Sequence, residues 1–535
     1  MEDAAWIDAQ TAGVEAARRE DSAFATVYSA STHGIDAFIV TVETHIQTQI
    51  PAFVVVGLPD NAVRESRERV TAAIKHASLP FPIGRIVVNL APADIRKEGS
   101  AFDLPLAIGI LAATGALPPT AIADTVFVGE LALDGRMRPT HGSLSIAIEA
   151  KRRGFRRIVL AADNAHEAAM VQGIDVHACS TLAEVLALLQ SEVPPPPFHV
   201  DLQAVFDGQL LQSGVDFRDV KGQEHVKRAF EVAAAGAHNI LLMGPPGSGK
   251  TMIARRLPTI LPPLNLDEAL ETTRIHSIAG LLPPGIPIIS SRPFRAPHHT
   301  VSDAALVGGG IGFARPGEIS LAHHGVLFLD ELPEFARNVL EVLRQPLEDA
   351  KVTIARTRMS VEFPANFMLV AAMNPCPCGQ FGNPFRECTC LPLQIHKYMG
   401  RVSGPLLDRI DIHVECPQVR YQELTDMRAG DASEQIRARV VAARERQRER
   451  FRGRAGLRTN ADMQSRDIRR VCVPDSAGQE LLKHAITHLG LSARAYDRIL
   501  KVSRTIADLG GSEHIRSEHI SEAVQYRTLD RKMWA

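Results

Sequence analysis

The stretch from Asn239 to Thr251, NILLMGPPGSGKT, restricts the possible folds more than any other part of the chain. Its apolar run from Ile240 to Met243 predicts a short buried strand. The strand leads into the pattern G-x-x-x-x-G-K-[ST], formed by Gly244, Pro245, Pro246, Gly247, Ser248, Gly249, Lys250 and Thr251. A strand before this pattern and a helix after it are typical of a phosphate-binding loop, not of a chance glycine-rich turn.

Each residue type in this loop suits a phosphate group. Glycines let successive backbone amides turn towards one anion, and the helix that follows points its positive end at the same place. We expect Lys250 to neutralise the β- and γ-phosphate oxygens and the Thr251 hydroxyl to bind Mg2+. Residues 244–251 therefore predict a site for ATP and Mg2+.

A second stretch, Gly325 to Glu331, reads GVLFLDE and predicts a buried strand of a parallel sheet that ends in two acids. We assign Asp330 to the Mg2+ ion and Glu331 to the general base that activates the attacking water. The alternative is a plain buried strand with a solvated acidic end. Taken with the phosphate loop, the stretch predicts ATP hydrolysis.

The size and composition set broad limits. At roughly 150 residues per domain, 535 residues predict three or four units. A net charge of -2 gives no argument for or against nucleic acid, so any basic surface must be local. No apolar stretch reaches the ~20 residues of a membrane span, and Met1 to Arg19 lacks a secretory signal, so we expect a cytoplasmic protein without a membrane segment.

The pattern along the chain predicts an α/β protein of several domains. Short strands and helices alternate in the first third, VPPPPFH reads as a stiff linker, and the last hundred residues are helical. We expect an extension at 1–26, an α/β domain at 27–192, a proline-rich linker at 193–214, an ATPase core at 215–425 and a helical lid at 426–535. The lid begins with nine arginines between Arg437 and Arg458, which indicate a solvated helix face or a phosphate-contacting surface.

Four further features lie between the two-acid strand and the C-terminus. Lys351 to Phe363 predicts a β-hairpin with a basic turn, and the buried strand from Phe367 to Met373 ends at Asn374, which can orient the hydrolytic water. The segment GPLLDRID places Arg409 after an apolar turn, and LSARAYD places Arg494 at the start of a helix.

The order of these motifs resembles the AAA+ ATPases of the magnesium-chelatase and MCM-helicase branch. The segments 296–310 and 491–509 and the NPCPCG motif resemble the ComM/YifB family, from about residue 27 to about 530. The resemblance implies that Asn374 is sensor 1, that Arg409 is an arginine finger reaching the neighbouring subunit's ATP, and that Arg494 is the sensor-2 arginine. The alternatives are an ion pair of Arg409 with Asp408 or Asp411, and of Arg494 with Asp497.

The first domain resembles the protease domain of Lon through GELALDGRMRP (129–139) and the turn from Lys97 to Asp103. Lon-like proteases use a Ser-Lys dyad. The alignment puts Ala101 at the nucleophile position, with Ser100 one place early, and no lysine follows Pro139 in THGSLSIAIEA. We therefore expect a structural or DNA-contacting domain without proteolytic activity.

Four cysteines lie together in the loop 374–392. Cys376, Cys378, Cys388 and Cys390 supply enough thiols for a tetrahedral Zn2+ site, and glycines and prolines between them favour tight turns. The C-x-C spacing is tighter than the usual C-x2-C, so reduced thiols are the alternative. We hypothesise that zinc stiffens a loop that projects towards a central pore.

The resemblance implies an ATP-driven motor, a hexameric ring that encircles DNA and promotes branch migration in homologous recombination during natural transformation. Lys351, Arg356 and Arg358 would then grip DNA phosphates from the hairpin, unless the hairpin is only structural. Other readings are a magnesium-chelatase subunit that remodels a protein partner and an ATP-dependent protease.

Overall fold

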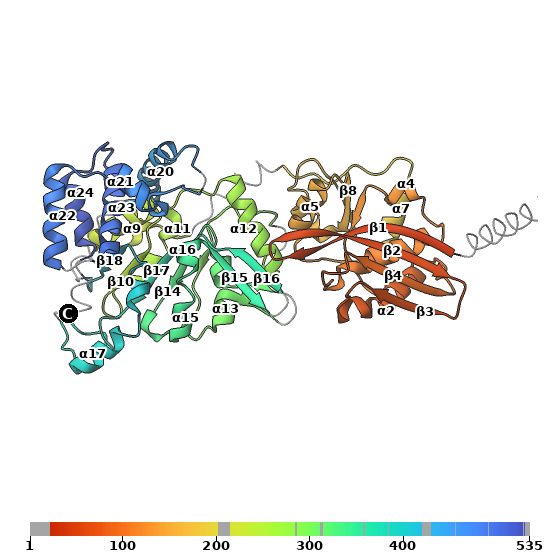
Figure 1. Ribbon diagram of the computed structural model, residues 1–535, viewed down its shortest axis with the longest axis horizontal. Coiled ribbons are helices and arrows are strands. Elements are labelled where there is room, and N and C mark those ends of the chain that lie inside the picture. Colours follow the sequence, from red (N-terminus) through yellow and green to blue (C-terminus); the bar gives the residue numbers. More distant parts are fainter. Residues whose placement is uncertain are drawn as a thin grey trace, which may run out of the picture. The chain divides into compact units, whose positions relative to one another are not determined.

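The computed structural model divides the chain into two compact units (Figure 1). It describes residues 22–201, 214–283, 286–310, 314–356, 359–383, 385–419, 430–454, 456–489, 492–527 and 529. Unit 1 comprises Met1–Gly208, Thr273–Ile289 and Gly310–Arg315, and unit 2 comprises Gln209–Thr272, Ser290–Gly309 and Pro316–Ala535. Two stretches from the middle of the sequence thus belong to unit 1, which the motif order did not predict.

Unit 1 contains a seven-stranded mixed sheet with the order β3-β4-β2-β1-β5-β8-β9. Its strands are β1 (Ser22–His33), β2 (Asp36–Gln47), β3 (Ala52–Val56), β4 (Arg85–Ala91), β5 (Thr125–Phe127), β8 (Arg157–Ala161) and β9 (Asp175–Cys179). The antiparallel pair β1–β2 runs in register from Ser22 opposite Gln47 to His33 opposite Asp36. Strand β1 therefore begins inside the segment predicted as an extension.

Helices cover this sheet and complete two apolar cores. They are α2 (Asn61–His76), α3 (Asp103–Ala113), α4 (Pro119–Ile122), α5 (Ser143–Arg152), α6 (Ala165–Ala168) and α7 (Leu182–Gln190), and a small hairpin joins β6 (Glu130–Leu131) to β7 (Met137–Arg138). Almost every residue of α3 is buried, as its continuous apolar sequence DLPLAIGILAA requires. The predicted alternation of strands and helices is confirmed.

Unit 2 is built on a five-stranded parallel sheet with the order β11-β14-β17-β10-β18. Its strands are β10 (Ile240–Met243), β11 (Phe294–Arg295), β14 (Val326–Leu329), β17 (Met368–Met373) and β18 (Ile412–Glu415). Every residue of β10, β14 and β17 is buried, which confirms the three predicted core strands. Because the strands are parallel, the loops that follow them leave from one edge of the sheet.

The remaining elements of unit 2 surround the sheet or follow it in sequence. The longer helices are α9 (Glu224–Gly236), α12 (Leu266–Ala279, whose last turns belong to unit 1), α20 (Ser433–Arg450), α22 (Ser476–Leu489), α23 (Ala493–Leu509) and α24 (Ser517–Gln525). Shorter elements are α10 (Lys250–Ala254), α11 (Leu257–Ile260), α13 (Asp303–Val307), β12 (Gly308–Gly309), β13 (Arg315–Pro316), α14 (Glu318–Leu321), α15 (Arg337–Glu341), α16 (Pro346–Asp349), β15 (Lys351–Arg356), β16 (Met359–Pro364), α17 (Pro392–Met399), α18 (Gly404–Leu407) and α21 (Ser465–Val471). Among the described residues, no helix has both the length and the apolar character that crossing a membrane requires.

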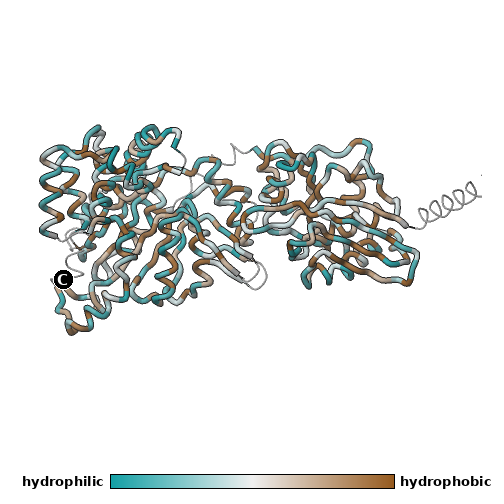
Figure 2. Tube along the Cα trace, in the orientation of Figure 1, coloured by the Kyte–Doolittle hydropathy of each residue, from teal (hydrophilic) through white to brown (hydrophobic). Residues whose placement is uncertain are grey.

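The arginine-rich helix α20 uses many of its charges inside unit 2. Figure 2 shows it as largely hydrophilic, although Ile436, Val440 and Ala443 join the apolar core. Arg444 donates to the Ala234 carbonyl oxygen, and Arg450 pairs with Asp508. Arg444 thus joins α20 to α9, and Arg450 joins α20 to α23, uses that the sequence pattern did not predict.

Candidate nucleotide site

The phosphate loop and the two-acid strand meet at one edge of the sheet in unit 2. Strand β10 ends at Met243 and β14 at Leu329, with β17 hydrogen-bonded between them. Thr251 Oγ1 donates to Asp330 Oδ2 over 2.6 Å, although 79 residues separate them in sequence. The two stretches that predicted a nucleotide site therefore form one constellation.

The backbone of the loop requires its glycines. Gly247 and Gly249 have φ angles of +74° and +83°, in the left-handed region that residues with a Cβ rarely adopt. A Cβ atom at Gly244 would collide with the Cys416 carbonyl oxygen. The Gln223 side chain donates to the carbonyl oxygens of Ser248 and Pro417, each over 2.8 Å, and so ties the loop to the chain after β18.

Lys250 lies in a setting that favours an anion. The residue is 8% exposed, and burial lowers the pKa of its ammonium group. Its Nζ atom donates to the carbonyl oxygens of Gly244 (2.8 Å) and Pro245 (2.9 Å) and to Asn374 Oδ1 (3.2 Å), all of them uncharged acceptors. A phosphate oxygen near Nζ would supply the negative charge that these partners lack.

Glu331 is held in an unusual conformation beside Asp330. Its φ angle is +52°, a strained value for a residue other than glycine, and its backbone N–H donates to Asp330 Oδ1 over 2.9 Å. The side chain is 54% exposed, and its Oε2 lies 3.1 Å from Nδ1 of His299. The sequence motifs did not predict a role for His299, although its APHHT segment was part of the family resemblance.

These groups fit ATP and Mg2+. A hydroxyl and a carboxylate are the hard oxygen ligands that Mg2+ prefers, and they already lie within hydrogen-bonding distance of each other. A buried ammonium and a glycine-rich loop supply the complement to a triphosphate. Water attacking the γ-phosphate is the chemistry that such a nucleotide supports.

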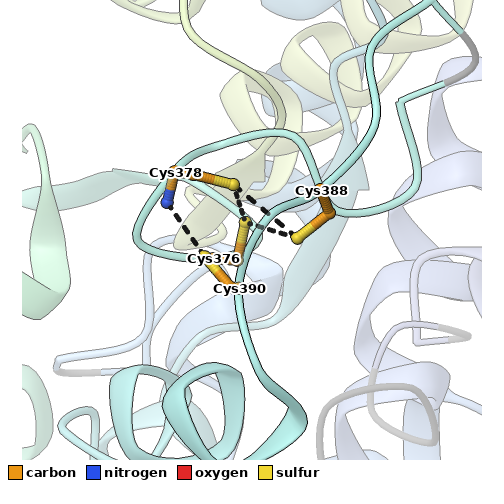
Figure 3. Close-up of side chains that lie close together, drawn as sticks. All are labelled: Cys376, Cys378, Cys388 and Cys390. Atoms are coloured by element: carbon orange, nitrogen blue, oxygen red, sulfur yellow. Dashed lines mark hydrogen bonds between the residues drawn. The ribbon is translucent and has the colours of Figure 1, made fainter.

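The four predicted zinc ligands also lie together (Figure 3). They come from the loop between β17 and α17, and the four Sγ atoms all lie within 4.8 Å of one another. Backbone N–H groups, first that of Gln380, lower the pKa of the Cys378 thiol to about 6. The cluster begins two residues after Asn374, the residue that binds Lys250.

Comparison with known proteins agrees with this geometry. The family model described as magnesium chelatase, subunit ChlI, matches residues 216–424, and two further models of the same subunit match 42–164 and 430–527. The competence protein ComM of Haemophilus influenzae is 45% identical over 95% of this chain and 98% of its own length. The uncharacterized protein YifB of Escherichia coli is 43% identical over 94% of this chain and 97% of its own length.

The chain belongs to the ComM/YifB family of magnesium-chelatase-like AAA+ proteins. A more distant relative is the magnesium-chelatase 38 kDa subunit of Rhodobacter capsulatus, 26% identical over 32% of this chain and 54% of its own length. The resemblance read from the motifs is confirmed.

The two arginines singled out in this ComM/YifB chain contact carboxylates of the same chain. Arg409 is 8% exposed, donates to the Pro405 carbonyl oxygen over 2.6 Å and pairs with Glu348. Arg494 is more open, with its side chain 63% exposed and Nη1 3.5 Å from Asp408 Oδ2. These partners differ from those that the sequence suggested. The suggested ion pairs were wrong: Arg409 with Asp408 or Asp411, and Arg494 with Asp497. The finger and sensor-2 roles remain predictions.

The hairpin of this family member is confirmed as an antiparallel pair, β15 with β16, in register from Lys351 opposite Pro364 to Arg356 opposite Met359. Lys351 Nζ donates to Glu362 Oε1 over 2.9 Å, so its charge is already paired. Arg358 and the side chain of Arg356 lie outside the described residues. Contact of these three residues with DNA remains a prediction.

In unit 1, two side chains of the turn from Lys97 to Asp103 make hydrogen bonds to other parts of the unit. Ser100 donates to the Glu130 carboxylate. Lys97 is fully buried, and its Nζ donates to the carbonyl oxygens of Pro92 and Ile95. The absence of a Ser-Lys dyad remains a prediction.

Proposed function

We propose that the chain is an ATPase that works as a motor on DNA. The observation that carries the proposal is the convergence of Lys250, Thr251, Asp330 and Asn374 at one edge of the sheet. In this reading Lys250 neutralises the β- and γ-phosphate oxygens, and Thr251 and Asp330 hold Mg2+. Glu331 removes a proton from the attacking water, and Asn374 orients that water.

The motor would be a ring of identical subunits, six by analogy with the family. Arg409 would act on the ATP of the neighbouring subunit, and Arg494, carried by the helical lid at 426–535, would act as the sensor-2 arginine. An arginine supplied in trans contributes about 10^3 to 10^5 in rate in well-studied NTPases. ATP hydrolysis would then require an assembled ring. The ion pair of Arg409 with Glu348 would be the state of the arginine finger before it contacts the neighbouring subunit.

The substrate would be DNA, and the setting natural transformation. Support comes from the Haemophilus influenzae relative, which is named a competence protein and matches 95% of this chain. We propose branch migration in homologous recombination, in the cytoplasm, with Lys351, Arg356 and Arg358 of the predicted basic hairpin contacting phosphates. Their positive charge would grip the DNA backbone without reading bases.

The N-terminal domain, proposed at 27–192 with a Lon-protease-like fold, would serve structure or DNA contact. The partners of Ser100 and Lys97 support this role over proteolysis. A linker at 193–214 and an ATPase core at 215–425 complete the proposed domain order.

A magnesium-chelatase role is the second candidate, favoured by the family model that matches 216–424. Such an ATPase remodels a protein partner and binds no DNA. The Rhodobacter capsulatus subunit matches only 32% of this chain, whereas the ComM and YifB proteins match nearly all of it, so the DNA motor is preferred.

The test compares the wild-type protein with Lys250→Ala. ATP hydrolysis and mobility shift of labelled branched DNA are measured together, and electron microscopy with ATP reports the ring. We expect hydrolysis that DNA stimulates in the wild type and none in Lys250→Ala. ATP hydrolysis without any mobility shift of the DNA would favour the chelatase role. Degradation of casein by the protein would favour a protease.

A further inference from the structure

The four cysteines of the loop 376–390 are spaced as ligands of one ion. The Sγ atom of Cys376 lies 3.4 Å from that of Cys378 and 3.7 Å from that of Cys388, and the Sγ atoms of Cys378 and Cys388 are 3.6 Å apart. Tetrahedral zinc with Zn–S bonds of about 2.3 Å places its sulfur atoms about 3.8 Å apart. All four cysteines are free thiols, so no disulfide explains the cluster.

Backbone groups support the sulfur atoms from outside. The N–H of Phe381 donates to Cys376 Sγ over 3.3 Å, and the N–H of Cys378 donates to Cys390 Sγ over 3.4 Å. Such N–H donors stabilise the negative charge of metal-bound thiolates. The tight turns that aim these donors use Gly379 and Gly382, both with φ of +76°.

Few apolar contacts stabilise the conformation of this loop. The described residues between β17 and α17 form no helix or strand, and Phe381, Phe385 and Leu391 are 55%, 63% and 65% exposed. A segment that buries so few apolar side chains needs another source of stability, which a metal crosslink supplies.

The loop also lies against the nucleotide site. A Cβ atom at Gly379 would approach within 2.7 Å of Pro246 Cγ, so the loop packs directly on the phosphate loop. Asn374, which binds Lys250 Nζ, lies two residues before Cys376. The preceding residue, Met373, accepts a hydrogen bond from the Gly244 N–H over 3.2 Å.

We infer that Cys376, Cys378, Cys388 and Cys390 bind one Zn2+ ion, and that this ion holds Asn374 and Gly379 against the phosphate loop so that ATP binding depends on zinc. The dependence of ATP binding on zinc rests on the proposed nucleotide site. The zinc site itself does not rest on that proposed function. Without the ion, the loop would spend most of its time away from Pro246. If only about a tenth of the molecules kept the competent arrangement, the apparent affinity for ATP would fall about tenfold.

The metal site is tested by composition and by spectroscopy on the full chain. Protein purified without added zinc should hold roughly one zinc per chain, and replacement by Co2+ should produce the absorption bands of tetrahedral cobalt thiolate. The double variant Cys388→Ser with Cys390→Ser should lose the bound zinc and the cobalt absorption bands. The control Cys472→Ala, which alters a buried thiol outside the cluster, should keep the zinc and the bands. Under half an equivalent of zinc in the wild type, with no cobalt spectrum, would overturn the site.

The coupling is tested on the wild type, which avoids variants that fail to fold. Affinity for a fluorescent ATP analogue is measured with zinc present, after removal by a chelator, and after zinc is restored. We expect about tenfold weaker binding without zinc and recovery on its return. Equal affinity in all three states would overturn the coupling and leave the zinc site standing. A zinc-loaded protein that binds no nucleotide would instead contradict the proposed function.

Discussion

The Thr251 hydroxyl donates a 2.6 Å hydrogen bond to the Asp330 carboxylate and so joins the first turn after the phosphate loop to the end of strand β14. Both oxygens belong to residues proposed to bind Mg2+. Their contact means that an ion entering here meets two ligands that the fold has already brought together.

Removing this hydroxyl should therefore raise the requirement for Mg2+. We expect Thr251→Val, which keeps the side-chain volume, to lower ATP hydrolysis about 100-fold, because one metal ligand is lost. Thr251→Ser restores the hydroxyl and should recover most of the activity. Turnover measured across a Mg2+ titration checks this. An unchanged Mg2+ dependence in Thr251→Val would rule out the hydroxyl as a ligand.

Glu331→Gln should separate ATP binding from hydrolysis. The substitution keeps the size of the side chain but removes the proposed base, so turnover should fall by about 10^2 to 10^4 while nucleotide affinity stays near that of the wild type. His299→Gln serves as the matched control, because it changes the imidazole beside Glu331 and leaves the carboxylate in place. If Glu331→Gln turned over ATP normally, the base would have to be another group.

Arg409→Ala should retain nucleotide binding and lose hydrolysis about 10^3-fold. Glu348→Gln removes the charge of its partner in the same subunit, and we expect it to hydrolyse ATP normally. A mixing experiment adds a direct test of action in trans. Arg409→Ala and Lys250→Ala should each be inactive, but mixed rings contain interfaces with both residues intact and should regain part of the activity. No recovery on mixing, in rings shown to contain both variants, would contradict a finger supplied by the neighbour.

Gly379→Ala and Gly382→Ala form a matched pair. Both glycines have φ of +76°, so both substitutions carry the same backbone strain of about 1–2 kcal/mol. Only at Gly379 does the new methyl group meet the Pro246 ring, since nothing lies within 4 Å of the Cβ position at Gly382. We expect ATP affinity, measured by fluorescence titration, to weaken in Gly379→Ala alone. Equal affinity in the two variants would show that the contact with the phosphate loop does not matter.

His177 should make unit 1 sensitive to acid. The residue is 5% exposed in β9, and burial, assisted by Arg157, lowers its pKa below the ordinary value, against the opposing charge of Asp175. Because the unfolded imidazole has a pKa of about 6.5, acidification below that value adds protons to the unfolded state first. Stability from this residue is therefore present above about pH 6.5 and lost as the pH falls towards the lowered folded pKa.

His177→Gln should flatten this dependence. The measurement is hydrogen exchange of the β9 amides at about pH 7.5 and about pH 5.5, after correction for the intrinsic exchange rates. His76→Gln, which changes an exposed imidazole at the end of α2, is the control and should behave as the wild type. A wild-type β9 equally protected at both pH values would contradict the prediction.

Local patterns predicted the elements of this fold well because each depends on near neighbours. The apolar runs 240–243, 325–329 and 367–373 became the buried strands of one sheet, and Lys351 to Phe363 became a hairpin. The same patterns missed the contribution of Thr273–Ile289 to unit 1, where the Ser277 hydroxyl oxygen accepts a 3.0 Å hydrogen bond from the Gly142 N–H. No short-range periodicity of the sequence predicts such a contact, because its two partners lie 135 residues apart.

The amino-acid sequence by itself determined which residues are proposed to carry the chemistry: the phosphate loop, the two acids, the strand-end Asn374 and the four cysteines follow from residue type and spacing. Tertiary structure alone decided the pairings: Arg409 with Glu348, Glu331 with His299 and Gly379 with Pro246. The physical reason is that a motif is defined by a few neighbouring residues and the local backbone conformation that they favour. An ion pair or a packing contact depends instead on where strands and helices from distant parts of the chain come to lie.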